Sequence, residues 1–104
     1  MTRGDIFRVR LPPGRGHEQR GPRYGVVVHA DALLGLSTVL IAPMSRAAGP
    51  ATFRPQVRVA GDVTRMLVEQ LRAVDVERLD EHVGRVTPAE QRAIDEALEL
   101  ILNL

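Results

Sequence analysis

Short apolar runs recur along the chain up to Val86, and their spacing predicts a mainly β fold. Phe7, Val9 and Leu11 alternate with polar residues, which is typical of a strand with one buried face. Later runs are β-branched and apolar throughout, as expected for strands that are buried on both faces. The strands expected from these patterns cover residues 5–11, 25–29, 38–42, 56–59, 66–74 and 82–86.

Proline and glycine mark the expected breaks between the strands. Pro12-Pro13-Gly14 ends the first strand and opens a long polar loop. Pro43 is expected to stop the third strand, because proline has no N–H to give to a ladder. Residues 56–59 are expected to form an edge strand. The other turns and loops are expected at residues 30–35, where one helical turn fits, and at 44–55, 61–62 and 75–80.

The C-terminal segment carries the signature of a helix start. Thr87 is a capping hydroxyl, Pro88 occupies the first helical position, and Glu90 completes a capping box. Apolar residues then recur at helical spacing, so this helix is expected to cover the strands or to extend toward a partner subunit. The stripe comprises Ile94, Ala97, Leu98, Ile101 and Leu102, and Leu100 and Leu104 widen it.

Five or six short strands followed by one helix predict a small SH3-like β-barrel with a C-terminal helix. The strands are expected to pair mostly antiparallel. A ferredoxin-like α+β fold is disfavoured, because no helix of ordinary length separates the early strands. At 104 residues, the chain is expected to form a single domain over residues 1–104.

Composition narrows the class of protein. No apolar run is long enough for a membrane span, and the first residues lack the apolar core of a signal peptide, which favours a cytoplasmic protein. Without cysteine there is neither a disulfide framework nor a thiolate site. The three histidines are scattered, so no metal site and no cofactor are expected.

The distribution of charge is more informative than the net charge of +1. Residues 1–65 carry ten Arg and four acids, net +6, whereas residues 66–104 carry four Arg and nine acids, net −5. A basic first half suits a polyanionic partner, and the planar fork of arginine suits phosphate. One Tyr and two Phe are too few for an extended base-stacking surface.

Residues 16–29 combine a dense polar loop with an apolar strand. The loop offers one imidazole, one carboxylate, one amide and two guanidiniums, and Gly16 and Gly21 give it a permissive backbone. A polar cluster rooted in a rigid strand is a common way to hold binding and catalytic groups, although a solvated hairpin loop has the same composition.

Several stretches together resemble the MazF/PemK-type toxins. Arg3-Gly4-Asp5-Ile6-Phe7 is similar to the opening of that family, and Gly16-His17-Glu18-Gln19 with Arg23 and Val-Val-Val is similar to its first loop and second strand. Residues 69–75, Glu-Gln-Leu-Arg-Ala-Val-Asp, resemble a later strand of the family. The end of the chain, from Leu79 through Gly84-Arg85-Val86 to Leu98, also matches in order.

The resemblance implies a fold, an activity and partners. Members of the family are homodimeric SH3-like barrels that cut single-stranded RNA at short sequences without a metal. They leave a 2′,3′-cyclic phosphate and a 5′-hydroxyl. A cognate MazE-like antitoxin inhibits them by laying a flexible segment over the active groove. The resemblance therefore implies a toxin of a type II toxin–antitoxin system that acts on mRNA.

The resemblance also assigns roles to particular residues. Arg23 matches the catalytic arginine, whose fork can grip a phosphate. Ser45 stands where the family usually has a catalytic threonine, and His17 matches a residue implicated in the PemK branch. Histidine is the natural proton carrier near neutral pH. The expected substrate-binding residues are Glu18, Gln19, Arg20, Arg46, Glu69 and Gln70.

Each role has a structural alternative. Arg23 would be a structural residue if it paired with Glu69 or Glu18, and Ser45 would be one if it only capped a turn. His17 can equally be a solvated loop residue. Glu69 and Gln70 can form a hydrogen-bond pair at a strand edge. His29 and His82 are interpreted as structural.

The chain departs from the family pattern at two places. Leu67 stands where the PemK branch has an arginine two residues before Glu69, so that branch's full acid–base arrangement is not expected here. Tyr24-Gly25 stands where many relatives have proline followed by an apolar residue. Tyr24 is expected either to shift the loop or to offer a base-stacking face.

Two other functions remain open at this point. One is a non-catalytic binder of the same fold: CcdB-type toxins poison gyrase through a Trp-Gly-like helix tip, whereas this chain ends Leu-Asn-Leu and has no tryptophan. The other is a degenerate MazF-like protein that retains only antitoxin or RNA binding.

Overall fold

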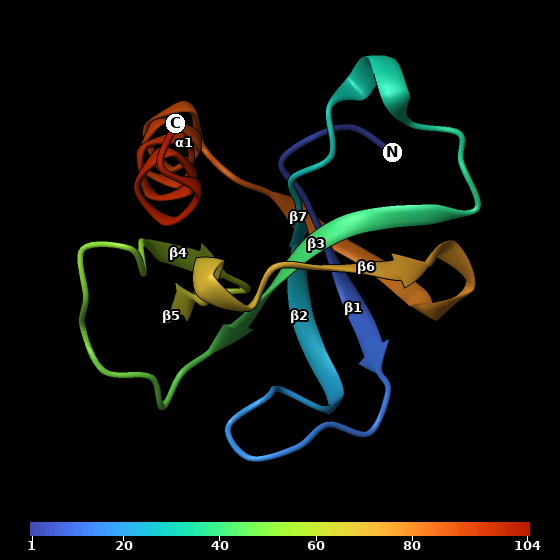
Figure 1. Cartoon of the computed structure of the whole chain (residues 1–104), viewed down its shortest axis with the longest axis horizontal. Helices are drawn as coiled ribbons and strands as arrows, with labels where there is room; N and C mark the ends of the chain where they lie inside the picture. The colour runs from blue at the N-terminus through green and yellow to red at the C-terminus, as the bar shows by residue number, and fades with distance from the viewer.

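The computed structural model describes all 104 residues and contains seven strands, three short 3₁₀ helices and one α-helix. All strand pairs are antiparallel, and the sheet has the order β4-β5-β3-β2-β1-β7, with β6 paired to β3 (Figure 1). The strands are β1 (Asp5–Leu11), β2 (Gly21–Val27), β3 (Thr38–Ser45), β4 (Gln56–Val59), β5 (Asp62–Met66), β6 (Arg72–Asp75) and β7 (Leu79–Arg85). The helices are η1 (Asp31–Leu33), η2 (Val68–Gln70), η3 (Val76–Arg78) and α1 (Pro88–Leu102).

The predicted mainly β fold with a C-terminal helix is confirmed, and β1 and β4 have the expected bounds. The predicted strand count was low, because residues 66–74 do not form one strand. They form the end of β5, the turn η2 and most of β6. None of the helices has the length and hydrophobicity that a transmembrane span requires.

β3 does not stop at Pro43 as expected. Its first half pairs with β6 and its end with β5, and the change of partner occurs around Pro43. At this point the Pro43 carbonyl accepts a hydrogen bond from the Leu67 amide (2.8 Å), just before η2. The missing N–H of Pro43 falls where no strand needs a donor, which is why proline is tolerated inside this strand.

β2 begins at Gly21, four residues earlier than predicted, and ends at Val27. Residues 21–24 are polar and contain proline, which predicts a loop. They are nevertheless paired with β1, from Leu11–Gly21 to Arg8–Tyr24. Arg23 therefore lies on a strand and not in a loop.

Two clusters of buried residues lie on the two faces of the curled sheet, so β2 is buried on both faces. Val26 belongs to the first cluster and its neighbour Val27 to the second. The first cluster is Ile6, Val26, Val28, Ala42, Met44, Val57, Val59, Met66, Val68, Val86, Ile94 and Ala97, and the second is Val9, Leu11, Val27, Val39, Ile41 and Val74.

α1 covers the first cluster, as the apolar stripe predicted (Figure 1). Ile94 and Ala97 are buried against the sheet, with Leu98 and Ile101 partly buried beside them. The predicted capping box is present: the Glu90 amide donates to Thr87 Oγ1 (3.1 Å) and the Thr87 amide donates to Glu90 Oε1 (2.8 Å).

The Arg3-Gly4-Asp5 stretch ties the start of the chain to the segment after β2, to α1 and to β7. The Arg3 guanidinium donates to the Val28 carbonyl (3.2 Å) and forms a salt bridge with Asp95 on α1 (2.9 Å). Asp5 accepts from the Thr2 amide (2.7 Å) and lies 3.3 Å from His82 Nε2 on β7. This part of the family resemblance therefore has a structural explanation.

Asp5 is buried, and its charge is stabilised in the fold. Burial alone would raise the pKa of Asp5, but the Thr2 amide, His82 and Arg85 outweigh this effect, so the pKa lies below its usual value. A carboxyl group with a lowered folded-state pKa contributes stability above its unfolded pKa, near 4, and loses that contribution as pH falls through the folded pKa.

We expect Asp5→Asn to destabilise the protein by about 1 kcal/mol at pH 7 and to weaken the loss of stability below about pH 4. Urea unfolding of both proteins between pH 7 and pH 3 measures this. Equal stability differences at the two ends of this range would show that the charge of Asp5 does not contribute.

Candidate active site

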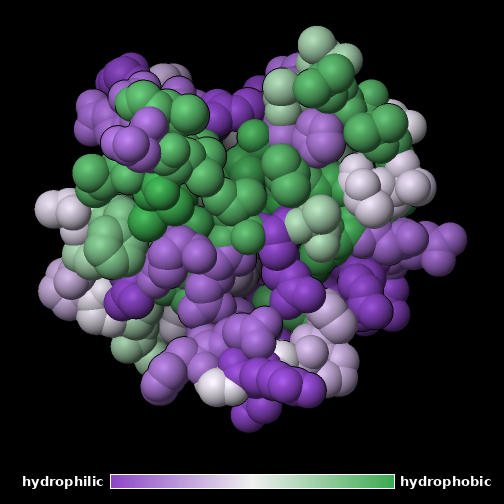
Figure 2. Space-filling view, viewed as in Figure 1, coloured by the Kyte–Doolittle hydropathy of each residue, from purple (hydrophilic) through white to green (hydrophobic).

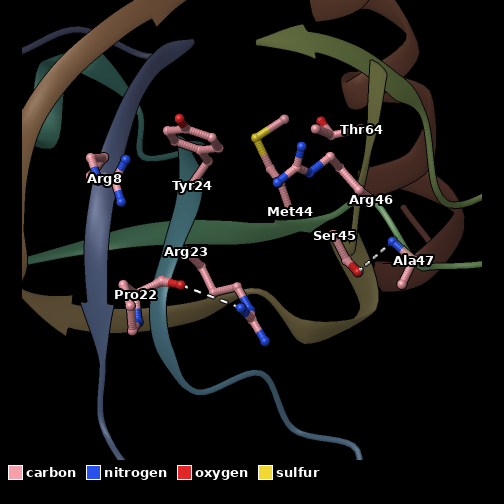
Figure 3. Close-up of a pocket in the computed structure, with 9 residues that line it drawn as sticks. All are labelled: Arg8, Pro22, Arg23, Tyr24, Met44, Ser45, Arg46, Ala47 and Thr64. Carbon is pink, nitrogen blue, oxygen red and sulfur yellow. Dashed lines mark hydrogen bonds between the residues drawn. The ribbon is translucent and has the colours of Figure 1, made fainter. Parts of the chain in front are cut away.

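A cleft opens where β2 runs past the end of its pairing with β3. The last pair is Gly25 with Pro43, so residues 21–24 keep only their β1 partner while the end of β3 turns toward β5. The cleft between them has a volume of about 370 Å³ (Figure 3). It is lined by Arg8, Pro22, Arg23, Tyr24, Met44, Ser45, Arg46, Ala47 and Thr64.

Arg23 lies on the wall of this cleft with an exposed guanidinium. Its Nε donates to Gln19 Oε1 (2.8 Å), and Nη1 donates to the Pro22 carbonyl (3.4 Å). It forms no salt bridge, so the alternative in which Arg23 pairs with Glu69 or Glu18 is wrong. A guanidinium oriented by neutral acceptors keeps its full charge for an anionic ligand.

Ser45 is the last residue of β3, and its hydroxyl lies at the cleft. Ser45 Oγ accepts a hydrogen bond from the Ala47 amide (3.2 Å), which forms a small turn after the strand. The turn occupies one lone pair of the oxygen and leaves the hydroxyl proton free to donate. Ser45 therefore caps a turn and keeps a donor at the cleft, and Figure 3 shows its hydroxyl directed at the Ala47 amide.

Two more arginines border the cleft. Arg46 is exposed and forms a salt bridge with Asp62 (3.1 Å), an exposed pair of small energetic worth. Arg8, on β1, forms no salt bridge and lies over the ring of Tyr24. Arg46 was a predicted site residue and Arg8 was not, because a β2 that begins only at residue 25 would not pair with Arg8.

The loop of residues 12–20 is held by the side chain of Gln70 on η2. Gln70 Oε1 accepts from the Gln19 amide (2.8 Å), and Gln70 Nε2 donates to the His17 carbonyl (3.0 Å). Gln19 in turn accepts from Arg23. A continuous chain of hydrogen bonds thus runs from η2 through the loop to the cleft.

The other predicted loop residues do not line the cleft with Arg23. The His17 imidazole is exposed and forms no hydrogen bond within the chain. Glu18 accepts from the Arg15 amide (2.9 Å), and Arg20 donates weakly to the Gly14 carbonyl (3.5 Å). The structure therefore brings together Arg23, Ser45 and Arg46, and it leaves these loop side chains outside.

Glu69 forms an ion pair with Arg54, a partner that sequence analysis missed. Arg54 Nη2 and Nε lie 2.6 and 2.8 Å from Glu69 Oε2, while Glu69 Oε1 is buried with no hydrogen-bond partner. Arg54 thereby ties the end of the loop after β3 to η2, next to Gln70. No sequence signal marks this pair, because only the fold brings positions 54 and 69 together.

Glu69 and Gln70 also line a second hollow of about 360 Å³, away from Ser45. It includes Glu18 and Gln19, so four of the predicted substrate-binding residues share one surface. No group of three or more His, Asp or Glu side chains is arranged to hold a metal ion. The interpretation of His29 and His82 as structural fits their contacts: His29 Nδ1 accepts from the Leu40 amide and His82 contacts Asp5.

Comparison with known proteins now places the chain in a family. Residues 2–102 match the model of a family described as PemK-like, MazF-like toxin of type II toxin–antitoxin system. This chain belongs to that family. The resemblance seen in the sequence is therefore confirmed.

The chain is also similar to individual proteins and solved structures named MazF or endoribonuclease. The chain is 37% identical to "Endoribonuclease MazF9" of Mycobacterium tuberculosis, over all of this chain and 98% of the relative. A crystal structure of MazF from Deinococcus radiodurans is 20% identical, with a TM-score of 0.87 over 100% of this chain and 97% of the other. An endoribonuclease in complex with its cognate antitoxin from a mycobacterial species is 18% identical, with a TM-score of 0.84 over 100% and 96%.

We expect Arg54→Ala to destabilise the protein by about 1–2 kcal/mol, because it leaves the partly buried Glu69 carboxylate without its charged partner. Glu69→Gln in the Arg54→Ala background should recover part of this loss. Urea unfolding of the two single variants and the double variant measures the coupling.

The matched control is Arg46→Ala, which breaks an exposed ion pair and should cost less than about 0.5 kcal/mol. If Arg54→Ala and Arg46→Ala destabilised the protein equally, the pair between Arg54 and Glu69 would not anchor the loop.

Proposed function

We propose that this chain is the toxin of a type II toxin–antitoxin system and an endoribonuclease that cleaves single-stranded RNA. Three observations support the proposal: the family match, the relative named as an endoribonuclease, and the cleft that combines Arg23 with Ser45. The exposed Arg23 guanidinium, held by Gln19 and free of any acid, carries the assignment. Since mRNA is the proposed substrate, we place the protein in the bacterial cytoplasm.

The proposed reaction is an internal transesterification that needs no metal. The ribose 2′-oxygen forms a bond to phosphorus, the bond from phosphorus to the 5′-oxygen breaks, and the products are a 2′,3′-cyclic phosphate and a 5′-hydroxyl. A base must take the proton of the 2′-hydroxyl, and an acid must give one to the leaving 5′-oxygen. The pentacoordinate phosphorane carries extra negative charge, which a fixed cation stabilises.

The residues at the cleft fit parts of this reaction. Arg23 is proposed to bind the phosphate and stabilise the phosphorane, and the Ser45 hydroxyl to donate to a phosphate oxygen. Arg46 adds positive charge along the RNA backbone. His17 is proposed as a proton carrier that the bound RNA brings into reach, since its imidazole is exposed on the loop held by Gln70.

The second hollow is proposed to bind the RNA beyond the cleaved bond. It presents carboxylate and amide groups, which accept hydrogen bonds from base amino groups, and Arg20 on the neighbouring loop adds charge. The proposed substrate-binding residues are Glu18, Gln19, Arg20, Arg46, Glu69 and Gln70.

We expect the purified protein to cleave a mixed-sequence single-stranded RNA in the presence of EDTA and to leave cyclic-phosphate ends. Arg23→Ala should lower kcat/KM about 100- to 1,000-fold, because it removes a preorganised charge from the transition state. Arg92→Ala, an exposed arginine on α1, is the matched control and should cleave like the natural protein.

Cleavage that stops in EDTA, or that persists unchanged in Arg23→Ala, would contradict the mechanism. No cleavage across a broad RNA library would instead favour a degenerate toxin that only binds. Ser45→Thr keeps the hydroxyl and restricts its rotamer, so cleavage should persist in the same assay.

A cognate MazE-like antitoxin is the proposed protein partner. An endoribonuclease of similar fold is known in complex with its cognate antitoxin. The cleft of this chain presents three guanidiniums, so an extended acidic segment has the charge to cover it. We expect a short reading frame with an acidic tail to overlap or abut this one upstream. Co-expression with its product should suppress RNA cleavage, and unchanged cleavage would contradict the pairing.

We also propose a homodimer that forms through an apolar surface of the chain. Figure 2 shows hydrophobic residues gathered over α1 and the neighbouring segments of the sheet. A groove there has the apolar lining residues Val28, Leu40, Leu71, Leu98, Leu102 and Leu104, with Arg3, Asp95 and Glu99 also in its lining. Leu33, Leu36 and Leu100 are exposed as well. Exposed apolar surface of this kind marks protein–protein interfaces.

Leu102→Glu should convert the dimer to a monomer in sedimentation equilibrium, because it places a charge in the apolar groove. Val63→Glu is the matched control, since Val63 is similarly exposed but lies on the β4–β5 hairpin. A protein that is monomeric at every concentration, or a dimer that only Val63→Glu disrupts, would contradict this surface.

A further inference from the structure

Tyr24 has a position that the proposed reaction does not use. It is the only tyrosine of the chain, which has no tryptophan. It follows Arg23 on β2 and is paired in register with Arg8 on β1. Residues directly opposite on paired strands point to the same face of the sheet, and the Arg8 guanidinium carbon lies 5.5 Å from the centre of the Tyr24 ring.

The Tyr24 ring is held in place by the core of the protein. It is half-buried and packs against the first hydrophobic cluster, which includes the buried Met44 on the other side of the cleft. Gly25 follows it where an added Cβ would lie 3.0 Å from Val9 Cγ2, so the strand is tightly packed at this point. The ring is therefore a preorganised wall of the cleft, and a ligand does not have to order it.

Arg8 keeps its positive charge available. Four arginines of the chain form salt bridges, but Arg8 forms none and is exposed. In Figure 3, Arg8 and Tyr24 lie on adjacent strands on one side of the cleft, with Arg23 on the same strand as Tyr24. The cleft thus combines an aromatic wall with two guanidiniums that no acid neutralises.

We propose that Tyr24 and Arg8 form a subsite for one nucleotide of the RNA, next to the phosphate that Arg23 binds. The base stacks on the Tyr24 ring in place of Arg8, whose guanidinium moves from the ring to the phosphate attached to that nucleotide. Every base has a π-face, so this subsite contributes affinity and position without selecting a base. The choice of RNA as the ligand rests on the proposed function.

The fluorescence of Tyr24 tests the stacking directly, since no other tyrosine or tryptophan contributes to the emission. The probe is a short single-stranded deoxyoligonucleotide, which lacks the 2′-hydroxyl and cannot be cleaved by transesterification. We expect its binding, followed separately by anisotropy of a dye on the oligonucleotide, to quench the tyrosine emission. An abasic oligomer with the same number of phosphates should bind without this quenching.

Substitutions test the two halves of the subsite. Tyr24→Leu should weaken binding of the deoxyoligonucleotide between about 5-fold and 100-fold, whereas Tyr24→Phe should bind within about 3-fold of the natural protein. Arg8→Gln should reduce the slope of log K against log salt by about 0.7, the amount expected for one lost contact to single-stranded phosphate. Arg92→Gln is the matched control and should leave the slope unchanged.

The outcomes separate this subsite from the proposed function. Four results would each overturn the subsite. They are tyrosine emission that is not quenched at saturation, equal quenching by the abasic oligomer, an unchanged slope of log K against log salt in Arg8→Gln, and no binding of the oligonucleotide at all. If the natural protein nevertheless cleaved RNA, the proposed nuclease function would stand without the subsite. Quenching and the expected slope without cleavage of any RNA would support the subsite and refute the nuclease.

Discussion

The candidate site depends on one amide side chain, that of Gln70. It accepts a hydrogen bond from the Gln19 amide and donates one to the His17 carbonyl, as a neighbouring strand would do. A carboxylate could not donate, and a hydroxyl is too short to span both groups. Because Gln19 also orients Arg23, this one side chain fixes both the loop of residues 12–20 and the direction of the guanidinium. A loop that looks flexible from its composition is thus held to the sheet.

Part of the charge imbalance between the two halves of the chain is used in ion pairs that join them. Acids of the second half neutralise arginines of the first, which joins distant segments of the fold. The positive charge left for an anionic ligand is therefore smaller than the count of arginines suggests, and two of the unpaired arginines line the cleft. The pairs between the halves are Arg3–Asp95, Arg10–Asp80 and Arg54–Glu69, and the cleft arginines without an acidic partner are Arg8 and Arg23.

Local signals predicted the elements that depend on local interactions. The alternation in β1 and the capping box of α1 are set by neighbouring residues, and both were correct. The errors lie where pairing between distant segments determines the local structure. One is at Pro43, where β3 changes partner, and the other is at η2. The site residues came from another source: the resemblance to the MazF/PemK-type toxins assigned roles to Arg23 and Ser45, and both line one cleft in the structure, whereas contacts between distant residues had no sequence signal. Those contacts are Arg54–Glu69 and Arg8–Tyr24.

The loop between Ser45 and Pro55 is held by hydrogen bonds at both of its ends. The Ser45 turn fixes its start and Arg54 fixes its end, and Arg54 also donates to the Gly49 carbonyl inside the loop. Lengthening such a loop costs only about 0.6 kcal/mol per doubling. Relatives could therefore diverge here by insertion or deletion while the sheet stays unchanged, so this rim of the cleft is free to evolve separately from the scaffold that supports it.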